Sequence, residues 1–289
     1  MPSGRIPRRR PSRTMDGMDN GTSSAAGPST CHRHRDRITY LRCSRCERHI
    51  CGECSRDSPV GQRCPECAGA TTRVVPARSI RSGMTPAVLV IIVISVAAYL
   101  AQRMNARFTI DYAHITVAVS AGEWWRVITA TFLHSTGSIV HILFNMYALY
   151  LFGPYIERQA GVIRFVALYL ASAITGGVAF QYLADGGAVG ASGAIFGLFG
   201  AVLVGTYPLR HTPAGAARFR QLLLLLAINL ALPLLVPGIA WEAHVGGLVA
   251  GMLIVGAWQR IPPGPSADLA RTLVPSILIL AGLLAVFVA

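Results

Sequence analysis

Apolar residues recur in long runs beyond residue 83, whereas polar residues dominate the chain before it. A helix needs about 17–25 mostly apolar residues to cross a bilayer. Seven runs approach that length, although several are short and Pro233 interrupts the fifth. The predicted spans are residues 84–101, 139–155, 162–184, 191–208, 221–236, 241–259 and 273–289. The pattern therefore predicts an all-α polytopic membrane protein that follows a small polar segment.

Composition supports this division of the chain. Of the 289 residues, 53% are apolar and only 13% are charged, whereas a soluble domain carries about 25% charged residues. The net charge of +13 is typical of nucleic-acid-binding proteins, but sixteen of the 26 basic residues lie in residues 1–85. A basic segment beside the anionic cytoplasmic surface of a membrane explains this charge more simply. We therefore expect no nucleic-acid partner, although the early arginines keep that alternative open.

Basic residues also predict the orientation. Arg5 to Arg13 are not followed by an apolar run, so we expect no signal peptide. A cytoplasmic N-terminus places 23 basic residues inside and three outside. The expected location is the cell (plasma) membrane, which the protein crosses several times. Residues 103–138 then form a long loop on the outer side. Its Trp125-Arg126 pair is expected to be an interfacial anchor, because both residue types favour the headgroup level.

Few polar residues lie within the predicted spans, and such residues are usually functional. His141 and Asn145 are four residues apart, so they share one face of the second span. Ser192 begins the fourth span among small residues, and His244 lies in the sixth. Both of these spans carry glycines four apart, which allow close helix contact: Gly193 and Gly197, and Gly247 and Gly251. The predicted topology brings all four polar residues into the outer half of the membrane.

These residue types point to acyl transfer. A serine hydroxyl becomes nucleophilic when a histidine within hydrogen-bond reach takes its proton. The oxyanion that develops needs donors, which His141, Asn145 and the Ser192 backbone N–H can supply. A lone serine in a membrane helix more often bonds to its own backbone, so the hypothesis rests on the combination. Glu242 is an alternative third member beside His244, but residues two apart point to different faces.

Four motifs now carry a family resemblance. They are Gly190-Ala191-Ser192-Gly193, Ala243-His244-Val245-Gly246-Gly247, His141-Ile142-Leu143-Phe144-Asn145 and Trp125-Arg126. In sequence, in order and in the spans that carry them, they resemble the motifs of the rhomboid family of intramembrane serine proteases. The resemblance covers about residues 84–260. It implies a six-helix rhomboid core, and residues 273–289 resemble the additional C-terminal transmembrane helix of some members.

The resemblance also implies roles for individual residues. Ser192 would be the nucleophile, His244 the general base, and His141 and Asn145 part of the oxyanion hole. Phe196 stands where bacterial members often have a tyrosine that packs on the catalytic histidine, so the ring is kept without its hydroxyl. Glu157 and Arg158 would belong to an inner loop. His134 lies two residues further from His141 than in the bacterial pattern, which leaves its role open.

The implied function is serine-type endopeptidase activity on the transmembrane segments of membrane proteins, single-span or other. The site would open to the extracytoplasmic side, and catalysis would need no cofactor. The alternative is a catalytically silent relative that binds and escorts membrane clients, with the N-terminal segment as adaptor. The chain keeps both Ser192 and His244, which favours the enzyme. A transporter is disfavoured because no charged relay or matched pair of broken helices is present.

The polar N-terminal segment carries four paired sets of metal ligands. They are Cys31-x-x-His34, Cys43-x-x-Cys46, Cys51-x-x-Cys54 and Cys64-x-x-Cys67. Eight ligands make two closed tetrahedral sites of the structural zinc type, and seven cysteines on the cytoplasmic side disfavour a disulfide framework. His32 and His49 are alternatives to His34. The segment resembles a B-box-type zinc finger, which implies pairing of the first set with the third and the second with the fourth.

A closed zinc site has no open position for water, so this small zinc-finger module is expected to be a platform that docks a cytoplasmic partner or regulates access. Residues 1–30 are rich in Arg, Pro, Ser and Gly and are predicted to be disordered. The predicted organisation is a basic tail at 1–30, a zinc-binding module at 31–68, a linker at 69–83, a membrane protease domain at 84–260 and an extra C-terminal transmembrane helix at 261–289.

Overall fold

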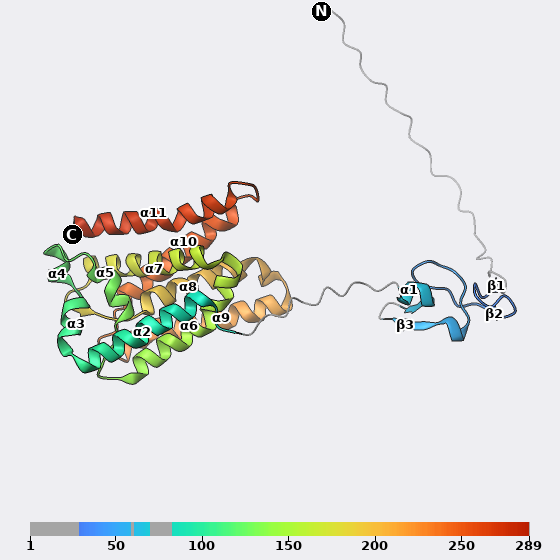
Figure 1. Ribbon diagram of the computed structural model, residues 1–289, viewed down its shortest axis with the longest axis horizontal. Helices are drawn as coiled ribbons and strands as arrows, with labels where there is room; N and C mark the ends of the chain where they lie inside the picture. Colours follow the sequence, from blue (N-terminus) through green and yellow to red (C-terminus); the bar gives the residue numbers. More distant parts are fainter. Residues whose placement is uncertain (1–28, 59–60, 70–82, 289) are drawn as a thin grey trace, which may run out of the picture. The chain divides into compact units, whose positions relative to one another are not determined.

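The computed structural model describes residues 29–58, 61–69 and 83–288, which form two units divided after Arg81 (Figure 1). Most of the predicted tail (1–30) and linker (69–83) lies outside the described residues. The exceptions at the tail are Ser29 and Thr30, which form strand β1 (Ser29–Thr30). The two units are considered separately.

The larger unit is built from apolar helices. Seven helices in the described part of the chain are long and apolar enough to cross a membrane. They are α2 (Pro86–Met104), α6 (Ile139–Ala160), α7 (Val162–Leu183), α8 (Ser192–Thr206) with its extension η3 (Tyr207–His211), α9 (Pro213–Ala231) with η4 (Leu232–Leu234), α10 (Trp241–Arg260) and α11 (Ala267–Phe287). The predicted all-α fold with six core helices and one additional C-terminal helix is confirmed. Pro233 lies in η4, beyond the end of α9.

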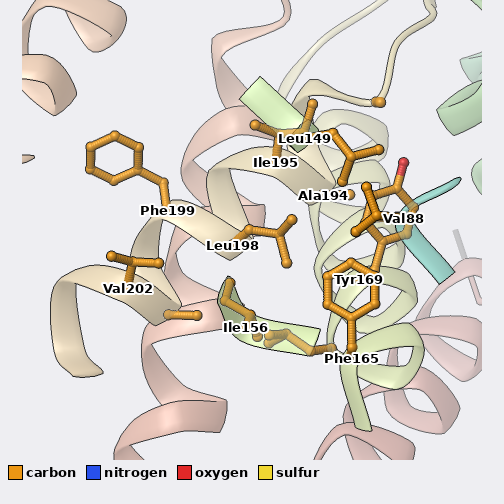
Figure 2. Close-up of a cluster of buried hydrophobic side chains, with 14 of the residues drawn as sticks. Val88, Leu149, Ile156, Phe165, Tyr169, Ala194, Ile195, Leu198, Phe199 and Val202 are labelled. Carbon is orange, nitrogen blue, oxygen red and sulfur yellow. The ribbon is translucent and has the colours of Figure 1, made fainter. Parts of the chain in front are cut away.

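Helix α8 is the centre of this bundle (Figure 1). In the 18-residue apolar stretch of α8 and η3, 67% of the residues are buried inside the protein, whereas the corresponding share for α9 and η4 is 6%. Its side chains pack into the main apolar cluster with residues of α2, α6 and α7 (Figure 2). Leu198 of α8, Leu149 of α6 and Phe165 of α7 are fully buried there. The helix that begins with Ser192 is therefore held on all sides by neighbouring helices.

Glycines bring α8 and α10 into direct backbone contact. A Cβ added to Gly247 would lie 1.9 Å from the carbonyl oxygen of Gly193, and one added to Gly251 would lie 1.8 Å from that of Gly197. No side chain can occupy such a space. The two small-residue faces predicted from the sequence therefore meet, which is how membrane helices pack most closely. This contact sets the beginning of α10 beside the beginning of α8.

The 103–138 loop contains several short elements after the end of α2. They are α3 (Ala106–Tyr112), β5 (His114–Ile115), α4 (Thr116–Ser120), α5 (Arg126–Thr129) and η2 (Ala130–Phe132). Strand β5 pairs antiparallel with β6 (Gly187–Ala188), which lies in the segment that leads into α8. The loop is therefore tied to the chain just before Ser192.

Arg126 holds this loop together from within. Its guanidinium donates to the carbonyls of Ile110 and Ala113 at 2.6 and 2.9 Å, and to the Glu123 carboxylate at 2.6 Å. The prediction of an interfacial anchor is wrong for Arg126, because its buried donors are satisfied by the loop rather than by headgroups. The neighbouring Trp125 is 39% exposed and remains suited to an interface.

The smaller unit is built around cysteines. Strand β1 pairs with β2 (Ile38–Thr39), and η1 (Gly52–Cys54) follows. Strand β3 (Arg56–Ser58) pairs with β4 (Gly61–Arg63), and α1 (Pro65–Gly69) is the last element of the unit that the structure describes. Its buried cluster consists of Ile50 and five cysteines, with Cys46 and Cys67 packed against them. Among the described residues the cluster holds one large apolar side chain, Ile50, and a core of that kind stabilises little on its own. Units of this kind usually depend on bound metal.

Candidate active site

Ser192 and His244 lie within hydrogen-bond distance. Ser192 is the first residue of α8, and His244 lies in the first turn of α10. The Ser192 Oγ is 2.9 Å from the His244 Nε2, and His244 is buried. The contact follows from the glycine interface. Gly193 comes one residue after Ser192, Gly247 comes three residues after His244, and these two glycines are in backbone contact. A hydroxyl and an imidazole in this arrangement can exchange a proton.

Phe196 packs flat on the imidazole. The Phe196 and His244 rings are 4.2 Å apart and inclined by 9°, which fixes the plane of the imidazole without offering it a hydrogen bond. Within the described residues, the His244 Nδ1 is buried and has no hydrogen-bond partner. Glu242 therefore does not orient the imidazole in the way that a third catalytic member would. Ser192 and His244 therefore form a two-residue contact, and no third side chain among the described residues bonds to the far nitrogen of the imidazole.

His141 presents a proton to the space beside Ser192. The backbone N–H of Ser135 donates to the His141 Nδ1 at 3.2 Å, so in the neutral ring the proton is on Nε2. A Cβ added to Gly190 would lie 3.0 Å from that Nε2 and 3.6 Å from the Ser192 Oγ. Gly190 has a φ of +133°, which other residues rarely adopt. Its missing side chain leaves the space between the two groups open.

Asn145 lies one turn further along α6. Its amide Nδ2 donates to the carbonyl of His141 at 2.9 Å, so one of its two N–H donors is committed to its own helix. The side chain is buried. The described contacts therefore join Asn145 to His141 rather than directly to Ser192, and only its second N–H donor is available to a ligand.

The start of α8 supplies further donors. The first N–H groups of a helix have no partner within it, and they carry the positive end of the helix dipole. Ser192 is the first helical residue, so its own N–H is one of these groups. The approach to α8 is fixed by the Gly190 N–H, which donates to the carbonyl of Ala130 at 2.9 Å. A developing oxyanion beside Ser192 would meet donors that are already oriented.

A small cavity lies beside Ser192. It has a volume of about 40 Å³ and is lined by Ser192, Gly193, Thr131 and His114, among others. A cavity with polar walls and that volume has room for water. The Nε2 of His114 donates to the Gln181 Oε1 at 2.9 Å, because the amide nitrogen of Gln181 is itself a donor to Thr116. Burial lowers the pKa of His114, which keeps the ring neutral and its Nδ1 an acceptor.

His134 packs against the His141 ring. It is fully buried, and the two rings meet edge to face with centroids 5.3 Å apart. The side-chain amide of Gln102 accepts from the His134 backbone N–H at 2.9 Å and donates to its carbonyl at 3.0 Å. Burial lowers the pKa of His134 to about 4, so the ring is neutral at physiological pH. Spacing alone did not predict this supporting role.

Glu157 has a structural role that the sequence did not predict. It lies in the last turn of α6 rather than in an inner loop, and it is buried. Its oxygens accept from the Thr85 hydroxyl at 2.5 Å and from the backbone N–H groups of Ala87 and Val88 at 3.1 and 3.0 Å. Glu157 therefore caps the N-terminus of α2. The sequence contained one signal for this contact. Helix α2 starts at Thr85-Pro86 with no acidic residue in its first turn, so its N-terminus lacks a nearby negative charge of its own.

The smaller unit gathers its ligands into two groups. Each group has its four ligand atoms within 4.8 Å of one another: Cys31, His34, Cys51 and Cys54, and Cys43, Cys46, Cys64 and Cys67. The first set joins the third and the second joins the fourth, in the cross-braced order. Of the three candidate histidines, His34 lies in the group, whereas the His32 ring contacts Arg48 instead.

The spacing within the groups fits a tetrahedral metal. The Cys46 and Cys64 sulfurs are 3.8 Å apart, and the His34 Nδ1 lies 3.3 and 3.4 Å from the sulfurs of Cys51 and Cys54. Zinc–sulfur bonds of about 2.3 Å in a tetrahedron separate two sulfurs by about 3.8 Å. Both groups can therefore bind a metal ion of zinc's size through four protein ligands.

Comparisons with known proteins concern the larger unit. A protein-family model described as "Rhomboid domain" matches residues 121–259. The chain is 32% identical over 171 residues to the rhomboid protease GlpG of Haemophilus influenzae, which covers 57% of this chain and 86% of GlpG. It is 37% identical over 140 residues to YdcA of Bacillus subtilis, covering 48% of this chain and 69% of YdcA. It is also 36% identical over 139 residues to the rhomboid protease GluP of the same organism, and this match covers 48% of this chain and 27% of GluP.

Proposed function

This chain belongs to the rhomboid family, and we propose that it is an intramembrane serine endopeptidase with Ser192 and His244 as its catalytic dyad. Relatives that are named rhomboid proteases support the activity at the level of the family. The observation that carries the proposal for this chain is the 2.9 Å contact between the Ser192 Oγ and the His244 Nε2 inside a helical bundle.

The proposed reaction follows from the positions of the donors and acceptors. His244 Nε2 takes the hydroxyl proton as the Ser192 Oγ attacks the scissile carbonyl carbon. The oxyanion accepts from the His141 Nε2–H, the Ser192 backbone N–H and the free N–H of Asn145. His244 then passes its proton to the departing amine, which leaves an acyl-enzyme on Ser192. A water that loses its proton to His244 hydrolyses the acyl-enzyme, and the cavity beside Ser192 has room for that water.

The proposed substrates are transmembrane segments of other membrane proteins. A helix in lipid hides its peptide bonds within its own hydrogen bonds, so the segment must unwind before Ser192 can attack it. Helix-breaking residues near the cut favour that step. The proposed location is the plasma membrane. The distribution of basic residues supports a cytoplasmic N-terminus there, which would open the active site to the extracytoplasmic side.

The test combines cleavage with a probe that needs no substrate. Purified protein in proteoliposomes is given a single-span test substrate and, separately, a fluorophosphonate that reacts with activated serines. Wild type should cleave and become labelled. Ser192→Ala should do neither, and His244→Ala should lose about 10⁴-fold or more of both rates. Asn145→Ala should lose about 10²-fold of the cleavage rate.

Ser172→Ala is the matched control, because it removes another buried serine hydroxyl from the same bundle, on α7. It should keep both activities. Cleavage that persists in Ser192→Ala would overturn the dyad. A folded wild type that neither cleaves nor reacts with the probe would favour the silent escort protein instead.

We further propose that the smaller unit binds two structural zinc ions, one in each ligand group, and serves as a cytoplasmic platform for a partner or for regulation of access. The support is the fit of the two groups to tetrahedral coordination. The ions would hold the cysteine core together and would take no part in peptide hydrolysis.

A further inference from the structure

Helix α11 packs along α7, with Leu278, Ile279 and Leu283 as half-buried contacts in its middle, and each of its ends makes further contacts. Only 11% of the residues in its 18-residue apolar stretch are buried, although the helix runs along α7 (Figure 1). At its first turn, the Asp268 carboxylate accepts from the Arg164 guanidinium at 2.7 Å. Nearby, the Trp258 indole donates to the carbonyl of Arg271 at 2.6 Å. These polar contacts anchor the beginning of the helix to α7 and α10.

The other end of α11 packs on the 103–138 loop. Val286 is buried in a cluster with Val119 of α4, Val127 of α5 and Ile174 of α7. The Phe287 ring lies 6.1 Å from that of Trp124, and the Tyr182 hydroxyl donates to the carbonyl of Ala285 at 2.7 Å. Val286 and Phe287 therefore form a tip that covers the loop.

The covered part of the loop leads directly to the active site. Val127 packs so closely on α7 that a Cβ added to Gly177 would lie 2.6 Å from the Val127 side chain. Three residues later, the carbonyl of Ala130 accepts the N–H of Gly190 at 2.9 Å. Gly190 in turn borders the space between His141 and Ser192. A shift of Val127 would therefore be passed to the segment that sets the oxyanion space.

We propose that the tip of α11, Val286 with Phe287, is a positioning element of the active site. By covering Val119 and Val127 it holds the 103–138 loop on α7, and with the loop it holds the contact between Ala130 and Gly190. The tip contacts no reacting atom. The inference rests on the proposed function, since its consequence is measured in the rate of peptide hydrolysis.

The test uses full-length protein in proteoliposomes. The variant Val286→Ala/Phe287→Ala removes the tip, and Leu280→Ala/Leu284→Ala is the matched control, because these side chains on the same helix are 61% and 58% exposed. The tip variant should lose about 10- to 100-fold in kcat with KM within about twofold of wild type, as expected for a small misplacement of catalytic groups. Val286→Ile, which keeps the buried apolar contact, should retain the wild-type kcat.

Amide hydrogen exchange supplies a second readout. Exchange in residues 117–130 should accelerate in the tip variant and not in the control. The inference is overturned if the tip variant keeps its kcat, or if kcat falls while exchange in residues 117–130 is unchanged. If the full variant fails to fold, Val286→Ala alone is measured against the same criteria. An inactive, folded wild type would instead contradict the proposed function, which separates the two failures.

Discussion

Gly247→Ala should disconnect the dyad without altering either of its residues. The added Cβ would lie 1.9 Å from the carbonyl oxygen of Gly193 and 2.7 Å from its carbonyl carbon. Both are backbone atoms, so no side chain can rotate to make room. The only relief is a separation of α8 and α10, which are the two helices that carry Ser192 and His244.

The size of that separation can be worked out. Carbon–oxygen contacts shorter than 3.0 Å essentially do not occur, so the 1.9 Å contact must open by about 1 Å at Gly247. If the helices separate as rigid rods, the Ser192 Oγ and the His244 Nε2 move from 2.9 Å to about 4 Å apart, beyond hydrogen-bond reach. A misplacement of about 1 Å costs on the order of 10²-fold in rate. We expect kcat to fall by about that factor.

The assay is proteoliposome cleavage together with fluorophosphonate labelling of Ser192, normalised to folded protein. Gly256→Ala is the matched control on the same helix, because its Cβ would meet only the end of the Arg260 side chain, at 3.6 Å. It should keep the wild-type rate, and alanine's better helix propensity should not destabilise it. A Gly247→Ala protein with wild-type labelling and cleavage would refute the reasoning that the glycine contact sets the dyad distance.

Two further predictions concern Glu157 and the smaller unit. In Glu157 the two carboxylate oxygens accept from different buried N–H groups, those of Ala87 and Val88, and Glu157→Gln replaces one of these oxygens with an NH₂ donor. It should lower the free energy of unfolding by about 1–3 kcal/mol in thermal or SDS titration. Asp111→Asn, which breaks an exposed 3.7 Å ion pair, should change it little. Equal effects of the two substitutions would contradict the capping role. Metal analysis should find about two zinc ions per chain and about one in Cys46→Ser, because that residue belongs to one ligand group. A metal-free unit with disulfide bonds would refute the zinc assignment.

The sequence predicted the number of spans better than their ends. Helix α9 begins at Pro213 rather than at residue 221, and α11 begins at Ala267 rather than at residue 273. A search for apolar runs stops at Arg218 and Arg220 in one case and at Asp268 and Arg271 in the other. Helices continue into the polar region where charged side chains find partners, as Asp268 does with Arg164. Hydropathy reports the part of a helix inside the bilayer rather than the whole helix.

Candidate site residues could be predicted where the reactive side chain stands in a short sequence motif. Ser192, His244 and His141 each stand in such a motif. The supporting contacts were not predictable, because they join residues far apart in the chain: Glu157 reaches Val88, and His114 reaches Gln181. No periodicity or local spacing encodes such pairs. They exist because the bundle brings their helices together.

The bundle itself explains why the dyad needs its glycines. In lipid, apolar side chains gain little by leaving solvent, so helices associate through close packing and interhelical hydrogen bonds. An interhelical hydrogen bond in a membrane contributes about 0.6 kcal/mol on average, too little for the contact between Ser192 and His244 to hold α8 against α10. The backbone contacts at Gly247 and Gly251 must do so instead. Loss of the serine hydroxyl should therefore leave the bundle nearly as stable as before, and the dyad distance is a consequence of helix packing rather than its cause.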